Sequence, residues 1–216
     1  MGKRVGVIGS GVVGETLADG FLRHGYEVMR GTRDPGKLAG WPGRQGSKAQ
    51  VGTMAETAKF GDLVVLAVKG TGAESALELC GTENLDGKTV IDTTNPIAAA
   101  PPDNGVLRFF TTLDDSLLER LERKAPGAHF VKAFSCVGNA LMVNPDLPGG
   151  PPTMFYCGRD ETAKREVEAI LRQFGHDPED MGGAEAARAI EPICILWCIP
   201  GFLRNDWVHA YRVLRK

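Results

Sequence analysis

The 216-residue sequence lacks the features that mark several common classes of protein. Its formal net charge is only −2, so it has no basic excess of the kind that a nucleic-acid-binding protein carries. Its longest apolar run, residues 192–202, is too short to cross a bilayer, which takes about 20 residues. Glycines interrupt the apolar stretch near the N-terminus, which argues against a signal peptide. We therefore expect neither a nucleic-acid partner nor a membrane partner.

Cysteine and histidine are also scarce, and neither is arranged as a metal site. The five cysteines are odd in number and include no CxxC pair, which indicates a reducing, cytoplasmic compartment. Their ordinary interpretation is that they are small buried hydrophobic residues. None of the four histidines stands at a ligand spacing from another, so no metal is expected.

Glycine and proline, in contrast, are abundant, and apolar strand-like runs alternate with helical patterns. Strands are predicted at residues 4–8, 26–30, 63–68, 89–92, 130–134 and 153–157. Helices are predicted at residues 13–24, 54–59, 73–80, 116–124, 161–174, 184–199 and 205–215. This alternation predicts an α/β protein with a doubly wound, mostly parallel sheet. We expect a nucleotide-binding domain over residues 1–158 and a small helical part over residues 159–216.

The segment Gly9-Ser10-Gly11-Val12-Val13-Gly14 follows the first buried strand and opens a helix. This is the context in which GxGxxG binds a dinucleotide. Gly9 would make the turn, Gly11 would let the pyrophosphate approach the backbone, and Gly14 would let the helix pack on the strand. The helix N-terminus would offer N–H groups to the phosphates.

The end of the second strand predicts which dinucleotide binds. An NAD site places a carboxylate there, but this sequence has Gly31-Thr32-Arg33, with Lys37 nearby. Residues 30–48 contain five basic residues, Arg30, Arg33, Lys37, Arg44 and Lys48, and one acid, Asp34. A 2′-phosphate could be held by the Thr32 hydroxyl and by the Arg33 and Lys37 cations. NADP is therefore favoured over NAD.

Ligands of such sheets lie beyond the carboxyl ends of the strands. This rule adds cofactor-binding candidates, which are Val68, Lys69, Asn95 and Ala133. The same rule suggests residues that could position the ring of a second molecule, which would accept a hydride from the cofactor. They are Asn95, Pro96, Phe134, Ser135 and Met142. Ordinary loop packing is the alternative for each of them, and for Lys69 a solvated loop lysine. No catalytic acid, base or metal set is present in the pattern, which fits direct hydride transfer.

The sequence also resembles a known family over nearly its whole length. The matching segments are GSGVVGETLADGFLRHGYEVMRGTRDPGKL, DLVVLAVKG, DTTNPI, KAFSCVGNALMVNP and ARAIEPICILW. They resemble the NADP-dependent deazaflavin-coenzyme (coenzyme F420) oxidoreductases. The resemblance implies a Rossmann fold, hydride transfer between NADP(H) and a deazaflavin, and a homodimer or higher homo-oligomer. One departure is Ser135, where deazaflavin-reducing members can carry a histidine.

Other functions stay open. Relatives of this family include ferric reductase domains, so an NADPH-dependent flavin or ferric reductase is an alternative acceptor chemistry. A non-catalytic NADPH sensor is a second alternative. The β-hydroxyacid dehydrogenases and pyrroline-carboxylate reductases share the glycine motif, but they add a much larger helical domain. The apolar run 192–202 is expected to form a subunit interface or a cleft wall, or else to pack on its own sheet.

Overall fold

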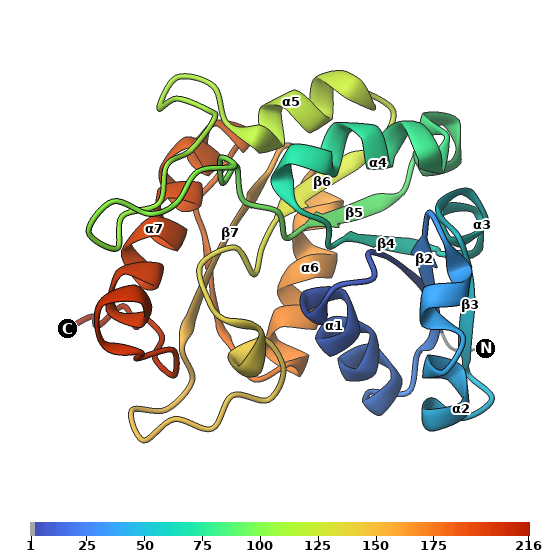
Figure 1. Ribbon diagram of the computed structural model, residues 1–216, viewed down its shortest axis with the longest axis horizontal. Coiled ribbons are helices and arrows are strands. Elements are labelled where there is room, and N and C mark those ends of the chain that lie inside the picture. The colour runs from blue at the N-terminus through green and yellow to red at the C-terminus, as the bar shows by residue number, and fades with distance from the viewer. Residues whose placement is uncertain (1–2) are drawn as a thin grey trace.

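The computed structural model describes residues 3–216 as one eight-stranded sheet flanked by helices (Figure 1). The strands are β1 (Arg4–Ile8), β2 (Glu27–Thr32), β3 (Ala49–Thr53), β4 (Leu63–Leu66), β5 (Thr89–Asp92), β6 (His129–Lys132), β7 (Thr153–Gly158) and β8 (Asp177–Asp180). The α-helices are α1 (Val12–Arg23), α2 (Trp41–Gln45), α3 (Met54–Phe60), α4 (Ala73–Cys80), α5 (Leu117–Lys124), α6 (Glu161–Gln173) and α7 (Ala187–Arg204).

The strand order is β3-β2-β1-β4-β5-β6-β7-β8. All neighbouring pairs are parallel except β6 and β7, which are antiparallel. The chain moves outward from β1 in one direction and from β4 in the other, so a crevice opens at the carboxyl ends of β1 and β4. The predicted α/β class with a mostly parallel, doubly wound sheet is confirmed.

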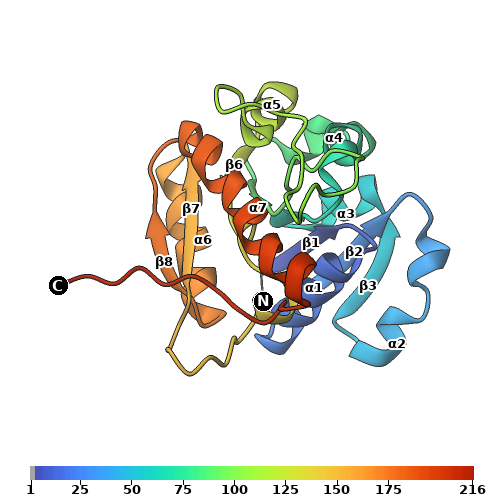
Figure 2. The ribbon, with the colours of Figure 1, turned by 60° about the vertical axis from the view of Figure 1, so that its left-hand side comes forward.

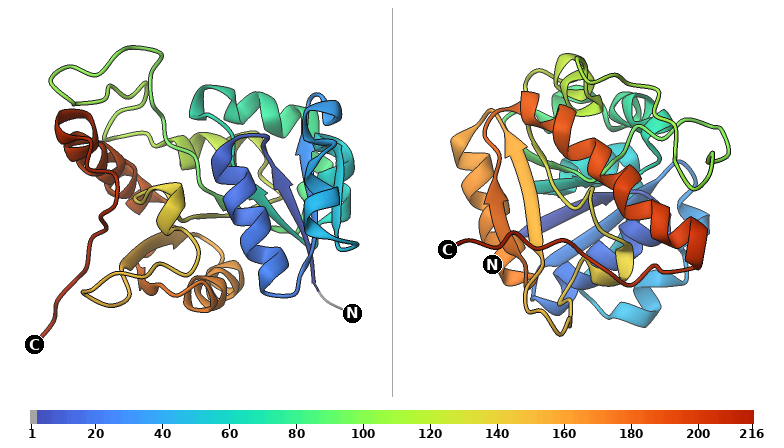
Figure 3. Two further views of the ribbon diagram at one scale, coloured as in Figure 1. Left: turned by 60° about the horizontal axis from the view of Figure 1, so that its bottom comes forward. Right: turned by 90° about the vertical axis from the view of Figure 1, so that its left-hand side faces the viewer.

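Helices cover both faces of the sheet (Figure 3), and a hydrophobic core lies on each face. Helices α1 and α6 cover one face, where Leu17, Phe21 and Val167 are fully buried. Helices α3, α4 and α5 cover the other face, where Leu77 and Leu121 are almost fully buried. Central strands such as β4, with sequence LVVL, are buried on both faces, as parallel strands of this kind require.

Several predicted elements differ from the structure. Strands β3 and β8 lie at the two ends of the sheet and were not predicted. Strand β8 has the sequence DPED, without an apolar residue, so the hydrophobic pattern carries no sign of it. Because β8 extends the same sheet, the segment 159–216 is not purely helical, and a boundary at residue 158 stays a prediction.

The predicted helix at residues 205–215 is wrong, because this tail runs as extended chain across the start of β7 (Figure 2). Thr153 N donates to Tyr211 O at 2.9 Å, and Val213 N donates to Thr153 Oγ1 at 2.9 Å. Trp197 Nε1 of α7 donates to His209 O at 2.8 Å. The tail therefore forms its hydrogen bonds with other elements, and these contacts replace helical ones.

Helix α7 is longer than predicted and contains Pro192 and Pro200. By length and composition alone, residues 184–204 could cross a membrane, although 39% of the apolar window is buried against the protein. Core helices of soluble proteins pass the same test. Trp197 and Cys198 face inward, at 8% and 9% exposure, whereas Leu196 and Leu203 are more than half exposed.

Candidate functional site

The glycine motif forms the turn between β1 and α1, as predicted. Gly9 has φ 148°, and a Cβ there would lie 2.1 Å from Ala67 O, so no larger residue fits. A Cβ on Gly14 would lie 2.7 Å from Gly9 O. At Gly11, no atom of the described residues lies within 4 Å of the Cβ position. Two glycines therefore allow close packing, and the third leaves the start of α1 open to a ligand.

A cleft runs along the carboxyl ends of β1, β2, β4 and β5. It consists of two cavities, of about 510 Å³ and about 490 Å³. Both are lined by Gly11, Ala67, Val68, Lys69 and Thr71, so they are continuous. An elongated molecule bound in this cleft would cross the N-terminus of α1, where free N–H groups and the helix dipole favour an anion.

The first cavity extends to the end of β2. There it is lined by Ser10, Thr32, Arg33 and Lys37. Thr32 is 6% exposed, while the Arg33 and Lys37 side chains are exposed and make no ion pair among the described residues. Asp34 also lines the cavity, but its carboxylate accepts a hydrogen bond from Gly36 N at 3.2 Å. The set is suited to a small dianionic group.

The other basic residues of the predicted cluster lie elsewhere, which corrects the count of local positive charge. Arg30 is fully buried, with its guanidinium 5.1 Å from the Trp41 ring and 3.4 Å from Glu15. Arg44 pairs with Glu15 at 3.2 Å, and Lys48 donates to Gly25 O at 3.1 Å. Side chains along β2 alternate between the two faces of the sheet, and the Arg30 side chain points into the space between α1 and α2. Only two of the five cations line the cavity.

The second cavity ends at the loop that follows β5, where Thr93, Thr94 and Asn95 line it. Asn95 Nδ2 donates to Ser135 O at 2.9 Å. Asn95 Oδ1 and Ser135 Oγ are buried and have no hydrogen-bond partner among the described residues. Unpaired buried polar atoms are costly, so this end of the cleft fits a ligand with polar atoms of its own.

Most of the predicted cofactor-binding residues line this cleft. Those that do are Gly9, Ser10, Gly11, Val12, Val13, Thr32, Arg33, Lys37, Val68, Lys69 and Asn95. Gly14 lies beneath the motif, and Ala133 is fully buried, with its N–H donating to Asp92 O at 3.1 Å. Ala133 therefore lies behind the cleft wall.

The predicted ring-positioning residues are mostly in the core, which corrects that part of the site. Phe134 is 1% exposed and packs against Phe174 and His176, at ring distances of 6.1 and 5.8 Å. Met142 is 3% exposed, and Pro96 is buried as well. Large apolar side chains gain more free energy in a closed core than on an open cleft wall. Of this set, only Asn95 lines the cavity, and Ser135 lies behind it.

Sequence reasoning missed several residues that do line the cleft. They are Met54, Ser75 and Leu79 in the first cavity and Ile97, Ala98 and Ala99 in the second. The latter belong to the long connection over residues 93–116, between β5 and α5. Its position after β5 was the available signal.

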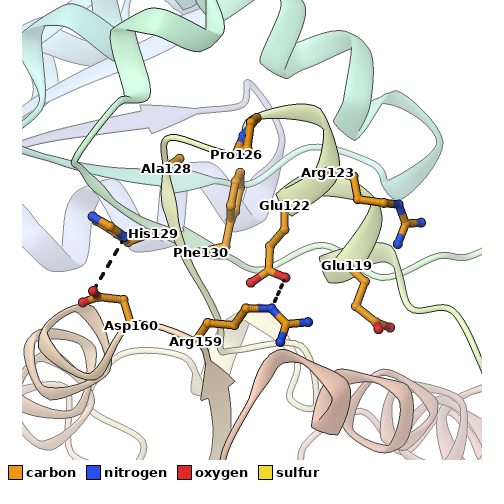
Figure 4. Close-up of a pocket in the computed structure, with 9 residues that line it drawn as sticks. All are labelled: Glu119, Glu122, Arg123, Pro126, Ala128, His129, Phe130, Arg159 and Asp160. Carbon is orange, nitrogen blue, oxygen red and sulfur yellow. Dashed lines mark hydrogen bonds and ion pairs between the residues drawn. The ribbon is translucent and has the colours of Figure 1, made fainter.

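Another cavity, of about 560 Å³, lies between α5, the start of β6 and the end of β7 (Figure 4). It is lined by Glu122, His129, Arg159 and Asp160, among others. These groups pair with one another: Arg159 Nε donates to Glu122 at 3.0 Å, and His129 lies 3.8 Å from Asp160. Because these charges are already paired, the cavity offers fewer free polar groups to a ligand than the cleft does.

All five cysteines are buried, and burial raises the pKa of three of them, Cys80, Cys136 and Cys157. Burial raises the pKa of Cys80 and Cys157 to about 12 and that of Cys136 to about 11. These thiols therefore stay protonated near pH 7. Within residues 3–216, no group of three or more His, Cys, Asp or Glu side chains is arranged to hold a metal ion.

Residues 4–96 match the family described as NADP oxidoreductase coenzyme F420-dependent. A crystal structure from Arthrobacter sp. FB24, assigned as an F420-dependent NADP-reductase, is 30% identical. It superimposes with a TM-score of 0.91, and the alignment covers 99% of each chain.

Two curated proteins are also similar. Metalloreductase STEAP3 of Rattus norvegicus is 30% identical over 93% of this chain, which spans 39% of that protein's length. An NADPH-dependent reductive aminase of Aspergillus oryzae is 22% identical, and this chain spans 65% of its length. An imine reductase from Pseudomonas sp. is 18% identical with a TM-score of 0.66, which indicates a shared fold.

Proposed function

The chain belongs to the family of coenzyme F420-dependent NADP oxidoreductases, and from that premise we propose that it transfers a hydride between NADP(H) and a planar deazaflavin-type ring. The observation that carries the proposal is the continuous cleft along the carboxyl ends of the strands. One end of it presents Thr32, Arg33 and Lys37, and the other presents the unpaired Asn95 Oδ1. The polar groups at the two ends are those that an NADP molecule needs.

At the phosphate end, the Arg33 and Lys37 cations would hold the 2′-phosphate, with the Thr32 hydroxyl as a further hydrogen-bond partner. The missing carboxylate at the tip of β2 removes the group that would otherwise bind a ribose 2′-OH and repel a phosphate. The N–H groups at the start of α1 and the open side of Gly11 would receive the pyrophosphate. NADP, not NAD, is therefore the proposed cofactor.

At the other end, bound NADPH would supply a hydride that passes directly to the acceptor carbon. The protein's own residues would align the two rings and exclude water. Asn95 offers an amide oxygen for a polar group of the cofactor, and its Nδ2 is already fixed to Ser135 O. Val12, Ile97 and Ala98 form an apolar lining on which a flat ring could lie. The chain is proposed to provide no general acid or base.

A turnover assay tests this function. The protein is incubated with NADPH and, separately, with a deazaflavin, FMN, FAD and a ferric chelate, and NADPH oxidation is followed at its absorbance maximum. The proposal expects the deazaflavin to be reduced fastest. If NADPH binds and none of the ring acceptors is reduced, the hydride-transfer proposal is wrong.

The ferric chelate is included because a second acceptor chemistry has support. The rat metalloreductase is as similar in sequence to this chain as the Arthrobacter protein is. NADPH oxidation with only the chelate would support a ferric reductase, and binding without turnover would support an NADPH sensor. The five buried cysteines form no disulfide, which is consistent with a reducing compartment such as the cytoplasm.

We also propose a homodimer or a higher homo-oligomer. The outward side of α7 exposes Leu196, Phe202 and Leu203, at 57%, 45% and 56%. A row of large apolar side chains on one helix is unusual on a free surface. The α7 side chains do not line either cavity of the cleft, so the interface alternative is favoured over the cleft wall.

A further inference from the structure

Three segments that carry the family resemblance meet at one buried point behind the cleft. They are the end of β5 with the loop after it, the end of β6, and the first half of α7. Lys132 Nζ lies 2.6 Å from Asp92 Oδ2, 2.9 Å from Glu191 Oε1 and 2.8 Å from Thr94 O. The side chains of Lys132 and Asp92 are fully buried, and that of Glu191 is 2% exposed.

The remaining oxygen atoms of this cluster are also bonded. Asp92 Oδ1 accepts hydrogen bonds from Thr94 N at 2.9 Å and from Thr94 Oγ1 at 2.7 Å. Glu191 accepts from Leu117 N at 3.0 Å and from Leu118 N at 3.1 Å, which are the first N–H groups of α5. The cluster holds one cation and two anions, and the N-terminus of α5 offsets the excess negative charge. Burial by itself lowers the pKa of Lys132, but Asp92 and Glu191 outweigh it and the net pKa is raised.

The cluster is hydrogen-bonded to Thr94, a residue of the cleft wall. Lys132 holds the Thr94 carbonyl and Asp92 holds the Thr94 amide and hydroxyl, so this residue is fixed on three sides. Asn95 follows directly and lines the second cavity. The loop that contains Gly70 packs tightly against Asn95, because a Cβ on Gly70 would lie 2.0 Å from Asn95 O. A shift at Thr94 would therefore be transmitted to Asn95.

We propose that Lys132 is a positioning residue that, with Asp92 and Glu191, holds the Thr94–Asn95 wall in the geometry that hydride transfer needs. This rests on the proposed function. It also explains why α7 is part of the site without touching the cleft, since its Glu191 completes the cluster. An error of about 1 Å in the alignment of two reacting groups can slow a reaction on the order of 100-fold.

The test compares Lys132→Met with the double variant Lys132→Met/Glu191→Gln. The single variant leaves two buried carboxylates without their cation, so its Tm should fall by roughly 5–15 °C. The double variant restores the net charge of the cluster, and its amide can still accept from α5, so much of the Tm should return. Neither variant has an ammonium group to hold Thr94 O. Lys164→Met is the matched control, since Lys164 is a buried lysine paired with Glu161 and Asp180 outside the cleft.

Three measurements separate positioning from a purely structural role. Affinity for 2′,5′-ADP, which probes only the phosphate end, should stay within about threefold of the native value in every folded variant. The fluorescence of bound NADPH, which reports on the nicotinamide end, should shift in both Lys132 variants and not in Lys164→Met. The rate of hydride transfer to the acceptor found in the turnover assay should fall roughly 10- to 100-fold in both Lys132 variants.

Native transfer and native NADPH fluorescence in the double variant would overturn the proposal, because Lys132 would then only neutralise charge. A loss of 2′,5′-ADP affinity equal to the loss of transfer would also overturn it, because the damage would be global. If the wild-type protein itself binds no NADPH, the proposed function fails first, and this inference fails with it.

Discussion

Replacing Arg33 with alanine tests the proposed preference for NADP, because this preference depends most on the Arg33 side chain. Arg33 is exposed, lines the first cavity and makes no ion pair among the described residues, so its charge is available to a 2′-phosphate. A hydrogen bond to a charged group contributes roughly 1.5–3 kcal/mol, which corresponds to about 10- to 100-fold in affinity. Exposure to solvent favours the lower end of that range. The affinity for NADH, which has no 2′-phosphate, should be almost unchanged.

Arg44→Ala is the matched control for this substitution. Arg44 lies in the same basic stretch, but it pairs with Glu15 and does not line the cleft. Titrations of NADPH and NADH, followed by protein fluorescence, should show selective loss only for Arg33→Ala. Equal losses for both cofactors would refute the assignment. A loss in Arg44→Ala as large as that in Arg33→Ala would show that general positive charge, not a local site, favours NADPH.

Three further outcomes are expected. Arg30→Met should weaken the binding of NADPH and of NADH to a similar extent. The reason is that Arg30 is buried beneath the glycine loop, with a guanidinium nitrogen 3.4 Å from Gly11 O. Paired titrations in which only NADPH binding weakens would contradict this expectation. Hydrogen bonding to Arg188 lowers the pKa of Glu119 from 4.5 to about 2, so its stabilising effect is complete above pH 4.5 and is lost as the pH falls toward 2. Glu119→Gln should therefore cost about 1 kcal/mol in urea unfolding at pH 7 and progressively less below pH 4.5; a constant difference would refute the pairing. Light scattering should find a homo-oligomer at micromolar concentration that Leu203→Glu converts to a monomer, and a native monomer would contradict the α7 interface.

The parts of the fold that could be predicted from the sequence are those in which one local pattern decides the structure. Buried parallel strands such as β4 are continuous apolar runs, and the glycine motif has a single geometry between β1 and α1. The edge strand β8 could not be predicted, because its residues DPED satisfy backbone hydrogen bonds without burying an apolar face. The tail beyond α7 was misassigned because long-range contacts, such as that of Tyr211 O with Thr153 N, replaced a weak local helical preference.

The same distinction, between residues placed by a local pattern and residues placed by long-range packing, applies to the candidate site. Thr32, Arg33 and Lys37 could be predicted because a short loop at a strand end keeps them together. Arg30, two residues before Thr32, was wrongly included, since only the structure shows that Trp41 and Glu15 cover it. Phe134 and the rest of the apolar acceptor set were misplaced because hydrophobicity alone does not distinguish a cleft floor from the core beneath it.

Isotope transfer distinguishes direct hydride transfer from NADPH to a planar ring from any route that passes through solvent. NADPH carrying deuterium at the transferred C4 position is oxidised with the deazaflavin, and the reduced ring is analysed by mass spectrometry. We expect the deuterium to appear on the acceptor ring with no loss to water, because the proposed mechanism has no protein acid or base on the path. Deuterium that exchanges into solvent, or an acceptor reduced without gaining it, would show that the hydride does not pass directly between the two rings.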